Sequence, residues 1–322
     1  MRKAVQNVFA VICVFVIHMP VYAENWFTFT LDNDLFIGRD DGYTNGVYFS
    51  LHNAGLAKEA PEPGLLISPL AFLFEKKAPL FSLNSWTFGQ TMVTPEDITA
   101  ENPDPRDVPY SGLIFLSNSF IRAWENEASK YTFAFGMVGP SSLAEESQRI
   151  VHKTIGSEIP QGWDYQLKDE FVFQLEYGRM WRRWLLEDRA DLILLADLAL
   201  GTIETFASSG TFVRFGNDLE YTYVTPSLRA TRTVNPIAID GGWFVFAGFN
   251  AHLYARRIFV DGNTFKESRS TELDHTQFSF AAGFTFSWKR LSASIAMENA
   301  HILEDSPDAV SRYGSLTLAW KY

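Results

Sequence analysis

The sequence predicts an all-β protein, a twelve-stranded antiparallel transmembrane β-barrel with an extracellular loop helix. Three observations lead to this fold class. Apolar and polar residues alternate along many segments, such segments recur along the chain, and the last residues alternate up to an aromatic C-terminus. Each observation is typical of barrels that cross the outer membrane of Gram-negative bacteria, where one face of every strand meets lipid.

The clearest alternation lies between Thr276 and Lys289, which read TQFSFAAGFTFSWK. Successive side chains of a strand point to opposite faces, so four phenylalanines and Trp288 share one face while small and polar residues share the other. In a soluble sandwich the aromatic face would pack against a second sheet. In a membrane barrel it faces lipid, and the polar face lines the lumen.

Repetition of such segments favours the barrel, because an even strand number brings both ends of the chain to the same side of the membrane. No apolar run of about 18 residues follows residue 23, so we expect no membrane-spanning helix. The twelve candidate strands are 25–32, 43–54, 86–94, 111–124, 130–139, 169–184, 190–201, 206–216, 243–258, 275–289, 290–301 and 312–322.

The C-terminal segment alternates from Leu316 to Tyr322. A last strand of this kind pairs with the first strand and removes both sheet edges, whereas the end of a soluble domain more often frays. We therefore expect the barrel-assembly machinery to recognise the C-terminal strand, and we expect the folded protein to be a monomer.

The N-terminal residues indicate a secretory signal peptide. Arg2 and Lys3 precede an apolar stretch that ends at Met19, and Ala23 completes a small-residue cleavage site. The expected domains are a signal peptide over residues 1–23 and a barrel over residues 24–322.

Cysteine and charge content exclude several classes of function. Cys13 is the single cysteine and lies within the expected signal peptide, so the remaining chain can form neither a disulfide nor a thiol nucleophile. The formal net charge of −11 argues against a nucleic-acid partner.

Strand order assigns the connections to the two sides of the membrane, if the first strand runs outward. The extracellular set is then 33–42, 95–110, 140–168, 202–205, 259–274 and the turn near 289–290. Residues 55–85 form a long periplasmic connection, and its apolar run from Leu65 to Phe74 predicts either an interfacial helix or a plug.

The first extracellular connection is rich in oxygen ligands. It contains Asp32-Asn33-Asp34, then Asp40-Asp41, and Thr44 follows at the start of the second strand. Hard cations such as Ca²⁺ bind carboxylate, amide and hydroxyl oxygens. The spacing is not that of an EF-hand, and Asp, Asn and Gly clusters more often stabilise turns.

The third extracellular connection contains a predicted helix over residues 141–155. Ser141 or Ser142 would form its N-cap, Glu145 and Glu146 occupy the first turns, and Gly156 ends it. Gln148 and His152 are four residues apart and so share one helical face. The side chains of Ile150, Val151 and Ile155 add apolar surface, which we expect to pack on the barrel lip or on lipid.

His152 is the strongest catalytic candidate in this connection. An imidazole titrates near neutral pH and can take a proton from water while a nearby cation polarises an ester carbonyl, so the two loops together suggest hydrolysis. A lone histidine on a surface helix is nevertheless more often just exposed. No Gly-x-Ser-x-Gly, phosphate-loop or His-Glu-x-x-His motif occurs.

With these residues the chain resembles the lipid A 3'-O-deacylase (LpxR) family of outer-membrane proteins. The matching segments run in order along the chain, each short, and they are specific only together. They are Asn33-Asp34, Asp41 to Gly46, Gln90 to Pro95, Pro109 to Gly112, Val138 to Ser141, Glu146 to His152, Gln161 to Gln166 and Phe259 to Phe265.

The resemblance implies a twelve-stranded barrel and Ca²⁺-dependent hydrolysis of the ester-linked 3' acyl group of lipid A, within lipopolysaccharide. It implies a site between the barrel wall and the loop helix, facing the outer leaflet. By the same resemblance His152 activates water, Asn33, Asp34 and Thr44 form the polar site, and Asp34 holds or orients Ca²⁺.

The remaining family positions match less closely. Asp41, a second candidate metal ligand, and Gln148 would support the site. A family carboxylate follows the histidine by a few residues, and Glu158 matches it better by spacing than Asp164. Basic residues that would grip the acidic sugars are sparse, and the candidates are Arg106, Arg149 and Lys153.

Two other functions fit the same residues. The first is an outer-membrane phospholipase or esterase that acts on another lipid. The second is a non-catalytic structural or pore-forming barrel, in which the loop residues only form turns and caps. Barrels of about twelve strands tend to be filled or narrow, which disfavours a general porin.

Overall fold

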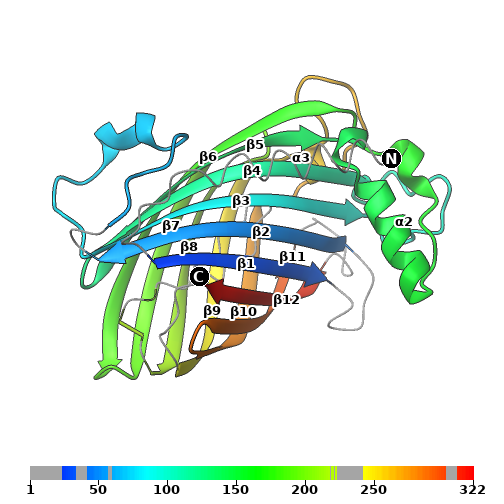
Figure 1. The fold of residues 1–322 in the computed structure, drawn as a ribbon. Helices are drawn as coiled ribbons and strands as arrows, with labels where there is room; N and C mark the ends of the chain where they lie inside the picture. Colours follow the sequence, from blue (N-terminus) through cyan, green and yellow to red (C-terminus); the bar gives the residue numbers. More distant parts are fainter. Residues whose placement is uncertain are drawn as a thin grey trace.

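The computed structural model describes residues 24–33, 42–56, 60–217, 219–220, 222, 242–301 and 310–322. These residues form one closed barrel of twelve antiparallel strands, in which every strand pairs with its sequence neighbours and β12 pairs with β1 (Figure 1). The expected signal peptide, Asp34 and Asp41 lie outside the described residues. No helix in the described ranges is long and apolar enough to cross a membrane.

All twelve predicted strands are present, with ends that shift by a few residues. The largest difference is at β3, which begins at Phe81 rather than at residue 86. The strands are β1 Glu24–Asn33, β2 Gly42–Leu56, β3 Phe81–Thr94, β4 Ser111–Ala123, β5 Glu127–Val138, β6 Glu170–Leu186, β7 Ala190–Gly201, β8 Glu204–Gly216, β9 Gly242–Arg257, β10 Thr276–Trp288, β11 Leu291–His301 and β12 Val310–Lys321.

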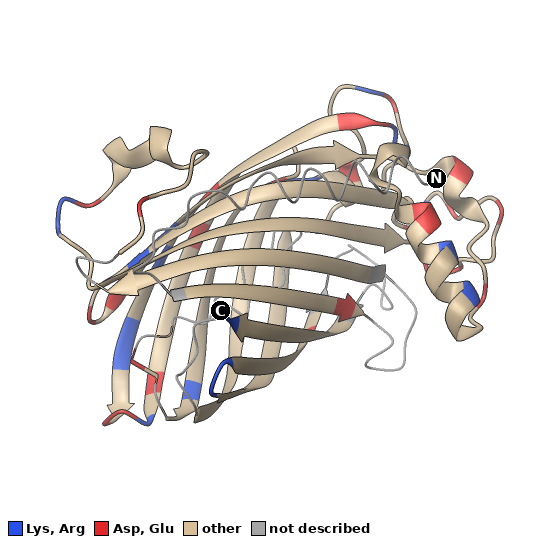
Figure 2. Ribbon diagram, in the orientation of Figure 1, with Lys and Arg blue, Asp and Glu red and all other residues tan. Residues whose placement is uncertain are grey.

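The two faces of the barrel wall follow the alternation in the sequence. On β10 the side chains of Phe278, Phe280 and Trp288 are exposed on the outer surface, whereas those of Gln277 and Ser279 are buried in the lumen. Charged residues lie mostly toward the strand ends and on the connections (Figure 2). The outer surface is therefore suited to hydrocarbon.

Side chains fill the lumen instead of leaving an open channel. Lys130 pairs with Glu176 at 2.7 Å, and the buried carboxylate of Asp191 binds two arginines. One apolar cluster occupies each end of the lumen, around Phe212 and Phe244 at one end and around Leu113, Phe115 and Phe206 at the other. Such packing argues against a wide pore.

Strand direction places five of the six predicted connections at one end of the barrel, the end that carries the loop helix α2 (Ala144–Ile155). The prediction for the turn near 289–290 was wrong. This turn joins β10 to β11, and because β10 runs away from the α2 end, the turn lies at the opposite end, like the turn between β6 and β7. Lys289 takes a left-handed conformation in it (φ 56°).

The long connection between β2 and β3 does not enter the lumen. Its described part, residues 60–80, contains the 3₁₀ helix η3 (Ser68–Leu73) and lies outside the strands near the end opposite α2 (Figure 1). Of the two predicted alternatives, the plug is therefore wrong.

Candidate active site

Helix α2 is held against the outer wall of the barrel, not over its opening. A Cβ atom added to Gly112 of β4 would lie 2.2 Å from both the Ser142 Oγ and the Ala144 Cβ, so only glycine lets the start of the helix come this close to the wall. Gln90 of β3 also fixes the start of the helix, because its Nε2 donates to the Ser142 carbonyl oxygen at 2.6 Å.

The predicted serine N-cap is wrong. Pro140–Ser142 form a short 3₁₀ turn, Leu143 takes a left-handed conformation at φ 59°, and no side chain caps the first turn of α2. The backbone N–H and the hydroxyl of Ser141 instead donate to the Asp169 carboxylate at 2.7 and 2.8 Å, which ties the helix start to β6. The predicted end is confirmed, because Gly156 is left-handed at φ 76°.

Helix α2 buries two polar side chains and leaves three large apolar ones exposed. Its buried face consists of Ala144, Gln148 and His152, and its exposed face contains Ile150 (61% exposed), Val151 and Ile155. Apolar side chains on an outer surface next to a lipid-facing wall are stabilised by hydrocarbon. The helix thus places Gln148 and His152 on the protein, and its exposed surface carries these three apolar side chains beside the charged Arg149 and Lys153.

His152 is 5% exposed, and one of its ring nitrogens is fixed. Its Nδ1 lies 2.5 Å from the backbone carbonyl oxygen of Glu158. A carbonyl oxygen only accepts hydrogen bonds, so Nδ1 carries the proton and the neutral ring leaves Nε2 as a base. Glu158 thus contributes through its backbone, and its side chain is exposed.

Gln148 lies one turn before His152 and is also buried. The Trp163 Nε1 donates to Gln148 Oε1 at 2.8 Å, which fixes the orientation of the amide. The Gln148 Nε2 has no hydrogen-bond partner among the residues that the structure describes. A buried donor without a partner is costly, so this N–H group is available for an acceptor on a bound molecule.

Trp163, on the 3₁₀ helix η5 (Gly162–Tyr165), is positioned by a neighbouring loop. Its ring packs on that of Tyr110 with a centroid distance of 4.8 Å, and the Tyr110 hydroxyl donates to the carbonyl oxygen of Ile98. Trp163, Gln90 and Tyr110 lie in segments that match the family, but the local sequence indicates no role for them. Their roles depend on contacts between separate loops, which no local pattern reveals.

Replacing Trp163 with phenylalanine tests this positioning role. The variant keeps the aromatic packing but removes the N–H donor, which leaves the Gln148 amide free to rotate. We expect the activity proposed below to fall by roughly tenfold, because one hydrogen bond of about 1 kcal/mol is lost and a buried polar group is left unpaired. Hydrolysis rates of the purified variant provide the measurement, and an unchanged rate would show that Trp163 only fills space.

Asn33 lies on the same outer wall as α2. Asp32 is buried toward the lumen, so Asn33, the next residue, points outward. The strand register aligns Asn33, Asn45, Met92 and Gly112 in one row across β1 to β4. Adjacent strands lie about 4.8 Å apart, which puts the backbone of Asn33 about 10 Å from that of Met92.

This row reaches the helix, because the Met92 side chain clusters with Ala144, Tyr110 and Trp163. Thr44 occupies a β-bulge of β2, where the pairing with β3 skips from Tyr43 to Asn45. Bulges are frequent next to active sites, where they redirect the chain. The register thus places Asn33 and the backbone of Thr44 on the part of the outer wall where β3 and β4 carry the start of α2.

The predicted substrate-binding residues differ in whether they already form an ion pair. On α2, Lys153 is exposed and Arg149 pairs with Glu145 at 3.1 Å. Arg106 forms a two-point contact with the exposed Asp104, and its hydrogen bonds lower the pKa of that carboxyl group to about 2. Asp164, the alternative to Glu158, is exposed on η5.

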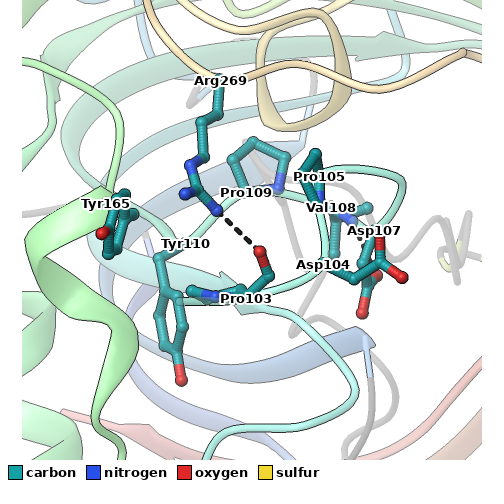
Figure 3. Close-up of a pocket in the computed structure, with 9 residues that line it drawn as sticks. All are labelled: Pro103, Asp104, Pro105, Asp107, Val108, Pro109, Tyr110, Tyr165 and Arg269. Carbon is teal, nitrogen blue, oxygen red and sulfur yellow. Dashed lines mark hydrogen bonds between the residues drawn. The ribbon is translucent and has the colours of Figure 1, made fainter. Parts of the chain in front are cut away.

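The loops above the site are fastened to one another. Arg269, from the connection after α3 (Ile258–Asp261), donates to the Pro103 carbonyl oxygen at 2.9 Å and lies 3.9 Å from the Tyr165 ring centroid (Figure 3). Asn263 exchanges two hydrogen bonds with the backbone of Lys168. The connections 95–110, 139–169 and 258–275 thus form one continuous rim.

Candidate metal ligands are only partly within the described chain. No group of three or more His, Cys, Asp or Glu side chains that could bind a metal occurs among the residues that the structure describes. Asp34 and Asp41 lie outside those residues, and the Thr44 side chain is not described. Of the predicted polar-site residues, only Asn33 has a side chain within the described residues. Its amide oxygen is a possible metal ligand.

The chain forms a closed barrel with an apolar outer surface, a filled lumen and a polar cluster beneath a helix on the outer wall. These features define an outer-membrane β-barrel protein. A family model described as outer membrane protein LpxR matches residues 8–322, and the chain belongs to this family.

Comparison with solved structures shows a likeness in fold. LpxR from Salmonella typhimurium superposes with a TM-score of 0.73 at 14% sequence identity, over 92% of this chain and 99% of that chain. The translocator domain of the autotransporter NalP from Neisseria meningitidis reaches a TM-score of only 0.45 at 9% identity, over 100% of this chain and 96% of that chain. No curated protein sequence matches this chain.

Proposed function

We propose that the protein is a lipid A 3'-O-deacylase that hydrolyses the ester of the 3' acyl group at the outer surface of its barrel wall. The observation that carries the proposal is His152, a buried base with a fixed tautomer, on the wall-facing side of a helix that also exposes Ile150, Val151 and Ile155. A substrate that remains in the membrane could reach this site without entering the lumen. Membership of the LpxR family supports lipid A as that substrate.

The proposed reaction uses His152 as general base and then as general acid. The Nε2 takes a proton from water, and the resulting hydroxide attacks the ester carbonyl carbon. When the bond between the carbonyl carbon and the 3' oxygen breaks, the imidazolium returns the proton to that oxygen, which stays on the sugar. The products are a free fatty acid and a 3' hydroxyl group, so one water is consumed per bond broken.

Gln148 would stabilise the charge that develops on the carbonyl oxygen. Its buried Nε2 donor has no described protein partner, and Trp163 fixes the amide from the other side. A preoriented donor of this kind lowers the barrier because it needs no reorganisation during the reaction. We assign Glu158 the role of fixing the imidazole through its carbonyl oxygen.

We further propose that Ca²⁺ binds beside His152. Asn33, Asp34, Asp41 and Thr44 offer the oxygen donors that this cation prefers, and none of them is a nitrogen or sulfur ligand. When bound, the cation would polarise the ester carbonyl. Asp34 and Asp41 would hold it, and Asn33 and Thr44 would orient the substrate ester.

The α2 end of the barrel would face the extracellular medium. Barrels of this class have short periplasmic turns and longer extracellular connections. The connections 95–110, 139–169 and 258–275 lie at the α2 end, whereas β4–β5, β6–β7 and β10–β11 are joined by short turns at the other end, which also carries the longer connections after β2 and β8. Lipopolysaccharide resides in the outer leaflet, so in this orientation the substrate would lie beside α2.

The test is the mass of lipid A after incubation with purified, refolded protein, with added Ca²⁺ or with a chelator. We expect loss of the 3' acyl group with Ca²⁺ and intact lipid A with the chelator. Fatty-acid release from phospholipid with unchanged lipid A would instead support an outer-membrane phospholipase. Ion conductance in planar bilayers without hydrolysis of either lipid would support the pore, against which the filled lumen argues.

A further inference from the structure

Residues 60–80, which we call the outer clasp, cover a polar patch on the outer wall at the end opposite α2. The Lys130 side chain pairs inside the lumen, so its neighbours Ser129 and Tyr131 point outward. The strand register places Arg122 of β4 and Arg179 of β6 on this same outer surface. Without a cover, these polar and charged groups would face hydrocarbon at a large cost.

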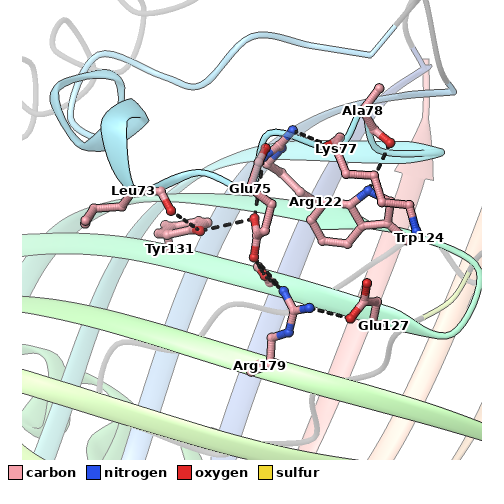
Figure 4. A network of polar contacts seen from close by, with 10 residues as sticks. Leu73, Glu75, Lys77, Ala78, Arg122, Trp124, Glu127, Tyr131 and Arg179 are labelled. Carbon is pink, nitrogen blue, oxygen red and sulfur yellow. Dashed lines mark hydrogen bonds and ion pairs between the residues drawn. The ribbon is translucent and has the colours of Figure 1, made fainter.

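Glu75 of the clasp neutralises this patch. Its carboxylate pairs with Arg179 at 2.5 Å and with Arg122 at 3.5 Å, and it accepts hydrogen bonds from Ser129 and Tyr131 (Figure 4). Arg179 also pairs with Glu127 of β5. The two arginines of the wall are thus neutralised by one carboxylate from the clasp and one from the barrel.

Backbone and apolar contacts fasten the rest of the clasp. Arg122 donates to the carbonyl oxygens of Glu75 and Lys77, and the Trp124 Nε1 donates to that of Ala78 at 2.9 Å. Ile67 is fully buried against Phe120 and Tyr131. The clasp is therefore fixed on the wall by three kinds of interaction and does not hang from it as a loose loop.

The opposite side of the clasp is apolar and exposed. Phe72 is 79% and Leu65 74% exposed, and Leu73 and Leu80 are more than half exposed. The side chains of Lys76 and Lys77 are exposed between Leu73 and Leu80. In water such a surface would be unfavourable by about 25 cal/mol for each Å² of apolar area.

We infer that the outer clasp is an interfacial anchor whose apolar side chains insert into the periplasmic phospholipid leaflet. Two observations select lipid as the occupant. The clasp continues the lipid-facing wall on which it lies, and Lys76 and Lys77 lie among its apolar residues in the chain, as cationic residues do at a phosphate headgroup layer. The clasp replaces a polar strip of the wall with an apolar surface and positions two cations at the membrane boundary. The inference is independent of the proposed deacylase chemistry.

The test measures the depth of spin labels in the full chain. Because Cys13 is the only cysteine, a Cys13→Ser background allows single labels at Phe72→Cys, at Leu318→Cys on the lipid-facing wall, and at Glu187→Cys in the exposed β6–β7 turn. The refolded protein is placed in vesicles of phosphatidylethanolamine and phosphatidylglycerol. Collisions with oxygen report hydrocarbon, and collisions with a water-soluble nickel complex report water.

We expect the Phe72 label to behave like the Leu318 label, open to oxygen and several-fold less accessible to nickel than the Glu187 label. Nickel accessibility equal to that of the Glu187 label would overturn the inference. Protection from both reagents would overturn it in favour of a second copy of the chain.

A second comparison tests the lysines. Lys76→Glu with Lys77→Glu should move the Phe72 label toward water, whereas Lys76→Arg with Lys77→Arg should keep its depth. An unchanged depth in the glutamate variant would contradict the role of the two cations at the headgroups.

Discussion

A His152→Ala variant is expected to fold and insert like the parent but to hydrolyse lipid A roughly 10²- to 10⁴-fold more slowly, the usual contribution of a general base. The ring is nearly buried, and its Nδ1 is committed to the Glu158 carbonyl oxygen, so Nε2 is the only nitrogen that can accept the proton of water. Removal of the ring eliminates both proton-transfer steps. Mass spectrometry of lipid A after timed incubation provides the measurement.

His275 offers a matched control for this variant. Its Nδ1 also contacts a backbone carbonyl oxygen, that of Tyr254 at 2.8 Å, but it lies before β10 and outside the helix that carries His152. His275→Ala should retain the parent rate. Equal losses in the two variants would point to a general effect of removing a rim histidine, and full activity of His152→Ala would exclude the proposed base.

An Asp191→Ala variant is expected to lower the free energy of unfolding by about 3–5 kcal/mol, the usual cost of breaking a buried ion pair from one side. Asp191 is completely buried in the lumen, where it accepts from Arg214 at 2.9 and 2.5 Å and lies 3.2 Å from the Arg182 Nε. Its removal leaves two buried guanidinium groups without their carboxylate. Urea titration of the barrel in lipid vesicles measures the change.

Glu187→Ala in the exposed β6–β7 turn serves as the control for Asp191, because an exposed surface carboxylate contributes at most about 1 kcal/mol. If Asp191→Ala lowered the free energy of unfolding by less than 1 kcal/mol, other groups in the lumen would have to solvate Arg182 and Arg214. The folded fraction should keep its hydrolytic rate, since Asp191 lies toward the end of the barrel opposite α2.

The barrel could be predicted because its determinant is local. A strand in a membrane barrel has one lipid-facing side and one lumen side, so apolar and polar residues alternate along it. Segments such as 276–289 show this alternation in the sequence. The observed strand ends differ from the predicted ones where polar residues on the outer wall interrupt the alternation, as at the start of β3. Gln148 and His152 were placed on one helical face by their spacing alone, and the structure buries both.

Other features of the site could not be predicted from neighbouring residues. The start of α2 is fixed by Asp169, just before β6, and by Gln90 of β3, so the serine N-cap expected from the local sequence was wrong. Whether Glu158 acts through its side chain or its backbone depends on how the chain turns after Gly156. The Trp163 contact to Gln148 requires two separate loops to meet.

The sequence by itself determined that this chain is a twelve-stranded outer-membrane barrel with a histidine-bearing loop helix, because alternation and helical spacing are properties of adjacent residues. Only the tertiary structure decided that the helix lies on the outer wall with its polar face inward, and that the 60–80 segment lies on that wall and does not plug the lumen. Both outcomes depend on which wall residues are polar and on which strands lie beneath, and strand register sets these relations between residues far apart in the chain.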